Sequence, residues 1–176
     1  MRRVLYRVAA SVDGYIAGPR GELDWIIHDP AVDLAKVYES VDTVLLGRRT
    51  YELTRQPGAP PWPRGWQIYV FSRTLRPEEH PGVTVVRADA GSRVASLRAM
   101  PGREIWLFGG GSLFRSLLAA KQVDFVEVVL VPVLLRGGVP LLETGAPLTR
   151  LALEEVERYA SGLLGLRYRV PDAAAV

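Results

Sequence analysis

Cysteine is absent from the chain, and histidine occurs only at His28 and His80. The lack of cysteine excludes disulfides and thiolate metal sites. Each histidine stands close to a proline in a stretch expected to be a loop, so two imidazoles gathered around one ion are not expected. The sequence therefore predicts no built-in metal site.

Long apolar runs are also missing. No stretch has the length that a transmembrane helix needs, so no membrane partner is expected. Residues 1–6 carry two arginines but lead directly into polar Ser11 and Asp13, which is typical of a first strand rather than a signal peptide. We therefore expect a cytoplasmic protein.

Lysine is scarce, because Lys36 and Lys121 are the only two, and the formal net charge of +3 comes almost wholly from arginine. The arginines form no basic stripe with interleaved aromatic residues, which argues against nucleic acid as a partner. Arginine at chosen points does suit forked recognition of a phosphate group. For most of these arginines, solvated surface charge is the simpler interpretation.

The overall composition is that of a globular protein. The 176 residues are 48% hydrophobic and 23% charged, which predicts one domain with a full core, residues 1–170, and a flexible tail at 171–176. Loops rich in glycine or proline are expected at 13–24, 56–65 and 132–140. The expected helices are 31–40, 48–53, 89–99 and the segment after Gly111, and the expected strands are 3–10, 43–47, 67–72, 83–87, 105–108 and 123–131.

Residues 149–159 and 163–170 surround Ala160-Ser161-Gly162 and read as an antiparallel hairpin. Strands and helices alternate before that point, whereas only strands follow it. This order predicts an α/β fold with a mostly parallel central sheet and an antiparallel C-terminal edge hairpin.

The most informative stretch is a short apolar strand, residues 105–108, that runs into three glycines and then into a helical pattern of apolar residues. A glycine turn between a strand and a helix exposes backbone N–H groups, which suit a phosphate or pyrophosphate. The glycines also fit a tight turn made only for close packing. The G-x-G-x-x-G fingerprint and the P-loop are absent, so neither an ordinary Rossmann dehydrogenase nor an NTPase is indicated. The residues concerned are Gly109, Gly110, Gly111, Ser112 and Leu113.

Two other strands end in residues that favour anions. Ligands of an open α/β sheet lie at the carboxyl edge of its strands, so three such ends together fit a dinucleotide phosphate. Taken singly, these residues also fit a packing glycine, a helix cap and solvated charges. The residues are Gly47, Arg48, Arg49 and Thr50 after one strand and Ser72 and Arg73 after the other, with Arg48 and Arg73 available for a 2′-phosphate.

Four short motifs occur in order at residues 9–17, 47–52, 71–73 and 108–113. Together they resemble the dihydrofolate reductase superfamily, and most of all its branch formed by the reductase domain of bacterial riboflavin biosynthesis, the RibD C-terminal domain, with further similarity over 123–142. The resemblance covers residues 3–170 and implies a three-layer dihydrofolate reductase-like fold. Because no deaminase domain precedes the motifs, a free-standing member is expected.

The resemblance implies NADPH as cofactor. Gly109 and Gly110 match a glycine pair joined by a cis peptide in the family, and residues 14–24 match a mobile loop over the active site. The remaining matches are Gly111, Ser112 and Leu113 at the pyrophosphate, Gly47, Arg48, Arg49 and Thr50 at the cofactor phosphates, Ser72 and Arg73 at the 2′-phosphate, and Ala10 and Ile16 beside the nicotinamide.

The substrate region departs from the folate enzymes. Their first helix begins with an acidic residue that anchors the pterin ring, and here residues 25–33 occupy that region with different spacing, so dihydrofolate is not the expected substrate. Trp25 and Asp29 are the candidate substrate contacts, although Trp25 also fits core packing. Asp13 and Asp24 are the candidate catalytic residues, although Asp13 also fits a turn formed by its Asp-Gly pair.

Three functions remain open. The first is an NADPH-dependent reductase of a small heterocyclic substrate, in which the cofactor supplies the hydride and the protein supplies orientation. The second is a non-catalytic NADP(H)-binding protein with a degenerate substrate pocket. The third is an interaction module that uses segments 123–131 and 149–170 as its surface, and in a working enzyme those segments would instead form a homodimer interface.

Overall fold

The computed structural model describes residues 1–146 and 148–171, and most of the tail expected at 171–176 lies outside these ranges. The helices are α1 (Leu34–Ser40), α2 (Arg48–Leu53), α3 (Ala90–Ala99) and α4 (Gly111–Ala119), with a 3-10 turn, η1 (Pro77–Glu79). The strands are β1 (Val4–Ser11), β2 (Tyr15–Ala17), β3 (Val41–Gly47), β4 (Gln67–Phe71), β5 (Thr84–Val86), β6 (Glu104–Gly109), β7 (Phe125–Val131), β8 (Val139–Pro140), β9 (Ala152–Arg158) and β10 (Leu164–Arg169). None of the helices in the described ranges is long and apolar enough to cross a membrane.

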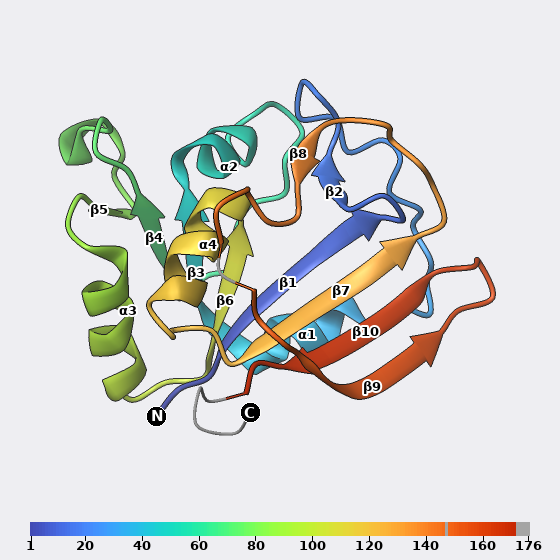
Figure 1. Ribbon diagram of the computed structural model, residues 1–176. Coiled ribbons are helices and arrows are strands. Elements are labelled where there is room, and N and C mark those ends of the chain that lie inside the picture. Colours follow the sequence, from blue (N-terminus) through green and yellow to red (C-terminus); the bar gives the residue numbers. More distant parts are fainter. Residues whose placement is uncertain (147, 172–176) are drawn as a thin grey trace.

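The main sheet has eight strands in the order β5-β4-β3-β6-β1-β7-β10-β9. The six strands from β5 to β7 run parallel, whereas β10 is antiparallel to β7 and β9 is antiparallel to β10. The predicted α/β fold with an antiparallel edge hairpin is thereby confirmed. Because parallel strands share one direction, the carboxyl ends of β3, β4 and β6 lie at the same edge of the sheet (Figure 1).

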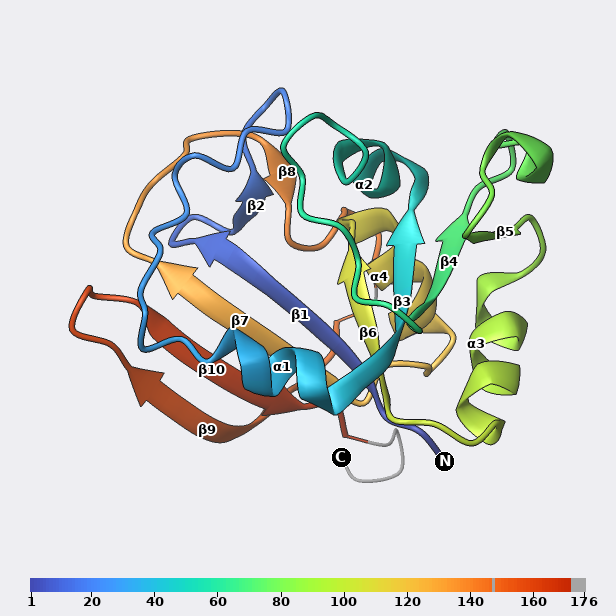
Figure 2. The ribbon, with the colours of Figure 1, turned by 180° about the vertical axis from the view of Figure 1, so that it is seen from behind.

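Helices cover both faces of the sheet, which gives three layers. Helices α3 and α4 lie on one face (Figure 1), and α1 crosses the other (Figure 2). Side chains alternate along each strand, so β3 serves two cores at once: Leu45 packs under α3 and α4, whereas Val44 and Leu46 face the opposite side. The second core is rich in aromatic side chains, among them Tyr51 and Trp106.

Two expected boundaries were wrong. The helix expected over 31–40 begins at Leu34, because residues 29–32 form a turn in which the Asp29 carboxylate accepts from the N–H of Ala31 at 2.8 Å. The loops expected at 13–24 and 132–140 each contain a short strand, and these strands, β2 and β8, pair with one another. The helix expected over 89–99 is confirmed, and Asp89 is its N-cap, since the Asp89 carboxylate accepts from the N–H of Ser92.

Candidate functional site

A cleft of about 1350 Å³ opens at the carboxyl edge of the parallel strands. Two groups of its lining residues differ in chemical character. The anion half comprises residues at or after the ends of β3, β4, β5 and β6, namely Gly47, Arg48, Arg49, Thr50, Ser72, Arg73, Arg87, Gly109, Gly110, Gly111, Ser112 and Leu113. The aromatic half comprises residues of β1, β2, α1 and β6 and of two loops, namely Arg7, Val8, Ala9, Ile16, Leu23, Ile26, Tyr38, Trp62, Trp106 and Phe108.

The glycine turn after β6 shapes the anion half. The peptide between Gly109 and Gly110 is cis, and α4 begins at Gly111 with no side chain capping its first N–H groups. A Cβ on Gly110 would lie 3.4 Å from Thr50 Oγ1, and a Cβ on Gly111 would lie 2.8 Å from the carbonyl oxygen of Pro140. The turn therefore needs glycine for packing and also leaves backbone donors uncovered, as an anion site requires.

The positive charge of the anion half is poorly compensated within the protein. Neither Arg49 nor Arg73 has a side-chain partner among the described residues, and Arg48 makes only long contacts, 3.4 Å to Thr74 Oγ1 and 3.7 Å to Glu52. Arg87 donates to the carbonyl of Leu75 at 2.7 Å. Guanidinium groups without carboxylate partners, beside uncapped helix N–H groups, fit the phosphates of a dinucleotide.

Ser72 is the most buried polar residue of the anion half, with 9% of its surface exposed. Its Oγ accepts from the N–H groups of Thr74 at 3.2 Å and Leu75 at 3.1 Å. These two bonds fix the turn that carries Arg73 at the end of β4. Sequence reasoning overlooked Arg87, although it follows β5 in the same way that Arg73 follows β4.

The two residues expected beside a nicotinamide differ in whether they line the cleft. Ile16 lines the aromatic half, whereas Ala10 is 1% exposed and packs in the core under α4. Its neighbour Ala9 faces the cleft instead, because side chains alternate along β1. Residue 10 can therefore reach a ligand through its backbone only.

Asp13 lies outside the cleft lining and holds two loops together. Its carboxylate accepts from Ser11 Oγ at 2.6 Å and from the N–H groups of Leu135 at 3.1 Å and Arg136 at 2.7 Å. The hydrogen bond from Ser11, with those from the two backbone N–H groups, lowers the pKa of Asp13 below its usual value. A carboxylate held in its ionised form by three donors suits a structural bracket better than a proton donor.

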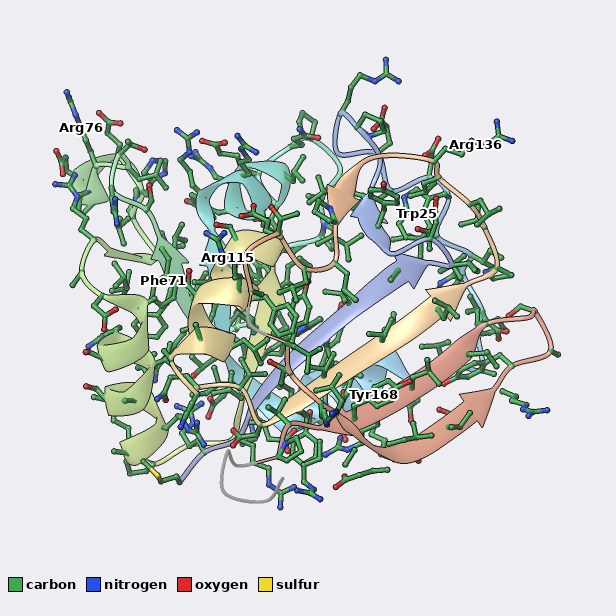
Figure 3. All side chains as sticks on the ribbon, viewed as in Figure 1. Trp25, Phe71, Arg76, Arg115, Arg136 and Tyr168 are labelled. Atoms are coloured by element: carbon green, nitrogen blue, oxygen red, sulfur yellow. The ribbon has the colours of Figure 1, made fainter. Side chains whose placement is uncertain are left out.

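The other three residues predicted for catalysis or substrate contact also lie outside the lining. Asp24 is exposed. Trp25 is half-buried, its Nε1 donates to the carbonyl of Glu22 at 3.0 Å, and Figure 3 shows it beside β2, on the opposite side of the view from Phe71 at the end of β4. The Asp29 carboxylate accepts from Ser161 Oγ and so joins the loop before α1 to the β9–β10 hairpin. The hydrogen bond from Ser161 lowers the pKa of Asp29.

The aromatic half was not foreseen from the sequence. Phe108 is its centre, with its ring 4.9 Å from that of Trp106 and 5.3 Å from that of Trp62, both in edge-to-face geometry. Trp62 comes from the proline-rich loop at 56–65, and Trp106 Nε1 donates to the Arg7 carbonyl at 3.0 Å. Nothing in the sequence separated these side chains from ordinary core residues.

Comparison with known proteins places the chain in context. The RibD C-terminal domain family matches residues 2–164. The uncharacterised protein YyaP of Bacillus subtilis (strain 168) is 29% identical over 178 residues, covering 95% of this chain and 94% of its own length. A crystallised protein of Shewanella sp. PV-4, provisionally assigned to riboflavin biosynthesis, superposes with a TM-score of 0.83 at 27% identity, covering 98% of this chain and all of its own.

Dihydrofolate reductase of Enterococcus faecalis, solved as a complex with NADP(H) and RAB-propyl, superposes with a TM-score of 0.70 at 21% identity and covers 97% of both chains. At that identity the similarity establishes the fold. The fold is therefore that of dihydrofolate reductase, as the sequence motifs predicted. The family match spans nearly the whole chain, so the protein belongs to the RibD C-terminal domain family.

Proposed function

We propose that the protein is an NADPH-dependent reductase of a small heterocyclic substrate. The observation that carries this proposal is the anion half of the cleft, where an uncapped helix start and arginines without carboxylate partners converge. The family and the reductase fold support the same assignment, and a dihydrofolate reductase of this fold was solved with NADP(H).

The groups of the anion half other than Arg87 each have a role in this proposal. The N–H groups at the start of α4, including those of Gly111, Ser112 and Leu113, would bind the pyrophosphate. Thr50 with Arg48 and Arg49 at the end of β3 would bind the cofactor phosphates, beside Gly47 and the Gly109–Gly110 pair. Arg73 would select the 2′-phosphate, because it stands on a turn that Ser72 fixes.

The aromatic half would hold the acceptor against the nicotinamide, with Ile16 and the β1 backbone at Ala10 beside it. When bound, NADPH would supply the hydride for a carbon of the acceptor, and one proton from the medium would complete the reduction. The apolar walls of the aromatic half would fix the orientation of the ring. The described residues of the aromatic half include no carboxylate, so we propose that water delivers the proton. Asp13, Asp24, Trp25 and Asp29 remain predicted catalytic and substrate residues, and this mechanism does not need them.

We further propose that the protein is a cytoplasmic homodimer. The edge strand β9 exposes apolar side chains, with Leu153 at 55% and Val156 at 47% exposure. An exposed edge strand offers unpaired backbone groups as well as this apolar surface, and a second copy of the same edge would cover both.

Titration with NADPH and NADH, followed by nicotinamide fluorescence, tests the cofactor assignment. Arg73→Ala should weaken NADPH binding by about ten- to hundredfold, the value of a charge-assisted hydrogen bond, and should leave NADH binding unchanged. Arg49→Ala should weaken both nucleotides. Arg76→Ala is the matched control, because Arg76 is exposed, lies outside the cleft lining and, within the described part of the chain, forms an ion pair with Glu79 alone, at 3.5 Å.

Failure of the unaltered protein to bind either nucleotide would refute the cofactor assignment. Nucleotide binding without oxidation of NADPH by any heterocyclic or quinone acceptor would instead favour the alternative, a non-catalytic NADP(H)-binding protein. The aromatic half argues for the reductase, because a cofactor-binding protein needs no second, apolar half in the same cleft.

A further inference from the structure

The walls of the aromatic half are built to hold a flat ring. Trp62 and Trp106 flank Phe108 in edge-to-face geometry, with ring centroids 5.3 Å and 4.9 Å from it. Tyr38 of α1 lies 6.2 Å from Trp106 on the same side of the sheet. At the mouth of the cleft stand Leu23 and Ile26, which are 49% and 39% exposed. Aromatic and aliphatic surfaces of this kind favour stacking with a planar conjugated molecule.

The single cation of this half is already neutralised. Arg7 Nε donates to Glu127, its Nη1 donates to Ser40 Oγ at 3.1 Å, and its Nη2 lies 3.6 Å from Glu104. The side chain is only 14% exposed. Each of the three nitrogens therefore has a protein partner, and two carboxylates, Glu127 and Glu104, compensate the charge of this guanidinium.

Acidic groups are equally missing from the described lining of the aromatic half. The two carboxylates that line the cleft serve elsewhere. Asp89 caps α3, and Glu143 stands 4.0 Å from Arg115 of α4. The free positive charge of the cleft is confined to the anion half, which the cofactor phosphates would occupy. A charged group on the acceptor would thus lose water without gaining an uncompensated opposite charge.

The geometry points to an acceptor that is flat, uncharged and conjugated, and that carries neither a phosphate nor a carboxylate on its ring. This inference rests on the proposed function, since it assigns the aromatic half to the substrate of that reaction. It separates this chain from an enzyme for a phosphoribosyl substrate, which would need an unpaired cation beside the ring. It also separates it from a folate reductase, which would need a carboxylate there.

Lumazine and lumazine-6-carboxylate test the inference, because the two share one bicyclic ring and differ by one charge. Their fluorescence is followed during titration with protein, with and without saturating NADP⁺, at a pH where lumazine is uncharged. Lumazine should bind about tenfold or more tightly than its carboxylate, because the unpaired carboxylate must be desolvated. Equal affinity, or tighter binding of the carboxylate, would overturn the inference.

Substitutions at Trp62 and at Ile26 should change the affinities for the two ligands in different ways. Trp62→Leu should weaken lumazine binding by about three- to tenfold, the range expected for one aromatic contact, whereas Trp62→Phe should retain most of the affinity. Ile26→Lys places a cation at an exposed position of the cleft mouth and should turn the preference toward the carboxylate. If neither Trp62→Leu nor Ile26→Lys changed the two affinities, the ring would bind elsewhere and the inference would be wrong.

The design separates this inference from the proposed function. Lumazine binding without any binding of NADP⁺ would support the aromatic half as a ring site and refute the cofactor assignment. Binding of NADP⁺ with no lumazine binding would keep the cofactor assignment and refute the ring site.

Discussion

Replacement of Gly111 by alanine tests the packing that holds the start of α4. The added Cβ would stand 2.8 Å from the carbonyl oxygen of Pro140, 3.3 Å from that of Leu141 and 3.5 Å from the N–H nitrogen of Glu143. Ordinary contacts of a Cβ begin at about 3.4 Å, and all three neighbours are backbone atoms that cannot rotate away. Either α4 or the segment around β8 must therefore shift.

The magnitude follows from two opposing terms. Overpacking of a well-packed site costs about 1–3 kcal/mol. Exchange of glycine for alanine also stabilises the folded state by about 0.4–1 kcal/mol, because the unfolded chain loses freedom. The overpacking term is larger, so Gly111→Ala should lower the free energy of unfolding by about 1–2 kcal/mol, or Tm by about 2–8 °C for a chain of this size.

Gly137→Ala is the matched control, because a Cβ there would meet no atom within 4 Å and its φ is not positive. Gly137→Ala restricts the unfolded chain in the same way as Gly111→Ala but introduces no clash. The free energy of unfolding should therefore stay unchanged or rise. Urea unfolding of both variants provides the measurement. If Gly111→Ala proved as stable as Gly137→Ala, the contact between α4 and the β8 segment would be loose, and the packing argument would fail.

Two further predictions concern the loop before α1 and the sheet edge. Because the bond from Ser161 lowers the pKa of Asp29, its carboxylate stabilises the fold above the ordinary pKa, and this contribution is lost as pH falls through the lowered value. Asp29→Asn should therefore reduce Tm at pH 7, and the difference from the unaltered protein should shrink below pH about 4, whereas a constant difference would exclude the carboxylate as its origin. Leu153→Arg on β9 should convert the proposed dimer to a monomer in sedimentation equilibrium without lowering Tm at monomeric concentrations, and a dimer that survives the change would place the interface elsewhere.

The parallel sheet could be predicted because its strands are buried on both faces and read as unbroken apolar runs, such as that of β6. Strands β2 and β8 could not, because they have three and two residues and exist only through their pairing with each other. The helix start at Leu34 was missed for a local reason, since Asp29 forms a turn that breaks the helical pattern.

The two halves of the cleft also differed in how far the sequence could predict them. The anion half could be predicted because its residues lie at or shortly after the carboxyl ends of strands, and parallel strands bring such positions together. The aromatic half joins Trp62 from a proline-rich loop to Trp106 and Phe108 from a central strand, and no local pattern marks that meeting. Asp13 and Asp29 were singled out because an aspartate in a loop can serve either chemistry or turn formation. Their long-range partners, the N–H groups of Leu135 and Arg136 for Asp13 and Ser161 Oγ for Asp29, follow only from the fold.

Mutations in the two halves of the cleft should differ in their effect on stability. Arg49 and Arg73 are exposed and pack against no core, so the anion half can be changed with little effect on stability. The aromatic half is the outer surface of the second core: Trp62 contacts Trp66 with ring centroids 6.1 Å apart, and Trp66 contacts Trp106, which is 9% exposed. A large change at Trp106 would therefore disturb the sheet as well as the ligand. Substrate preference is better altered at the exposed mouth, at Leu23 or Ile26, where a new side chain meets solvent rather than the core.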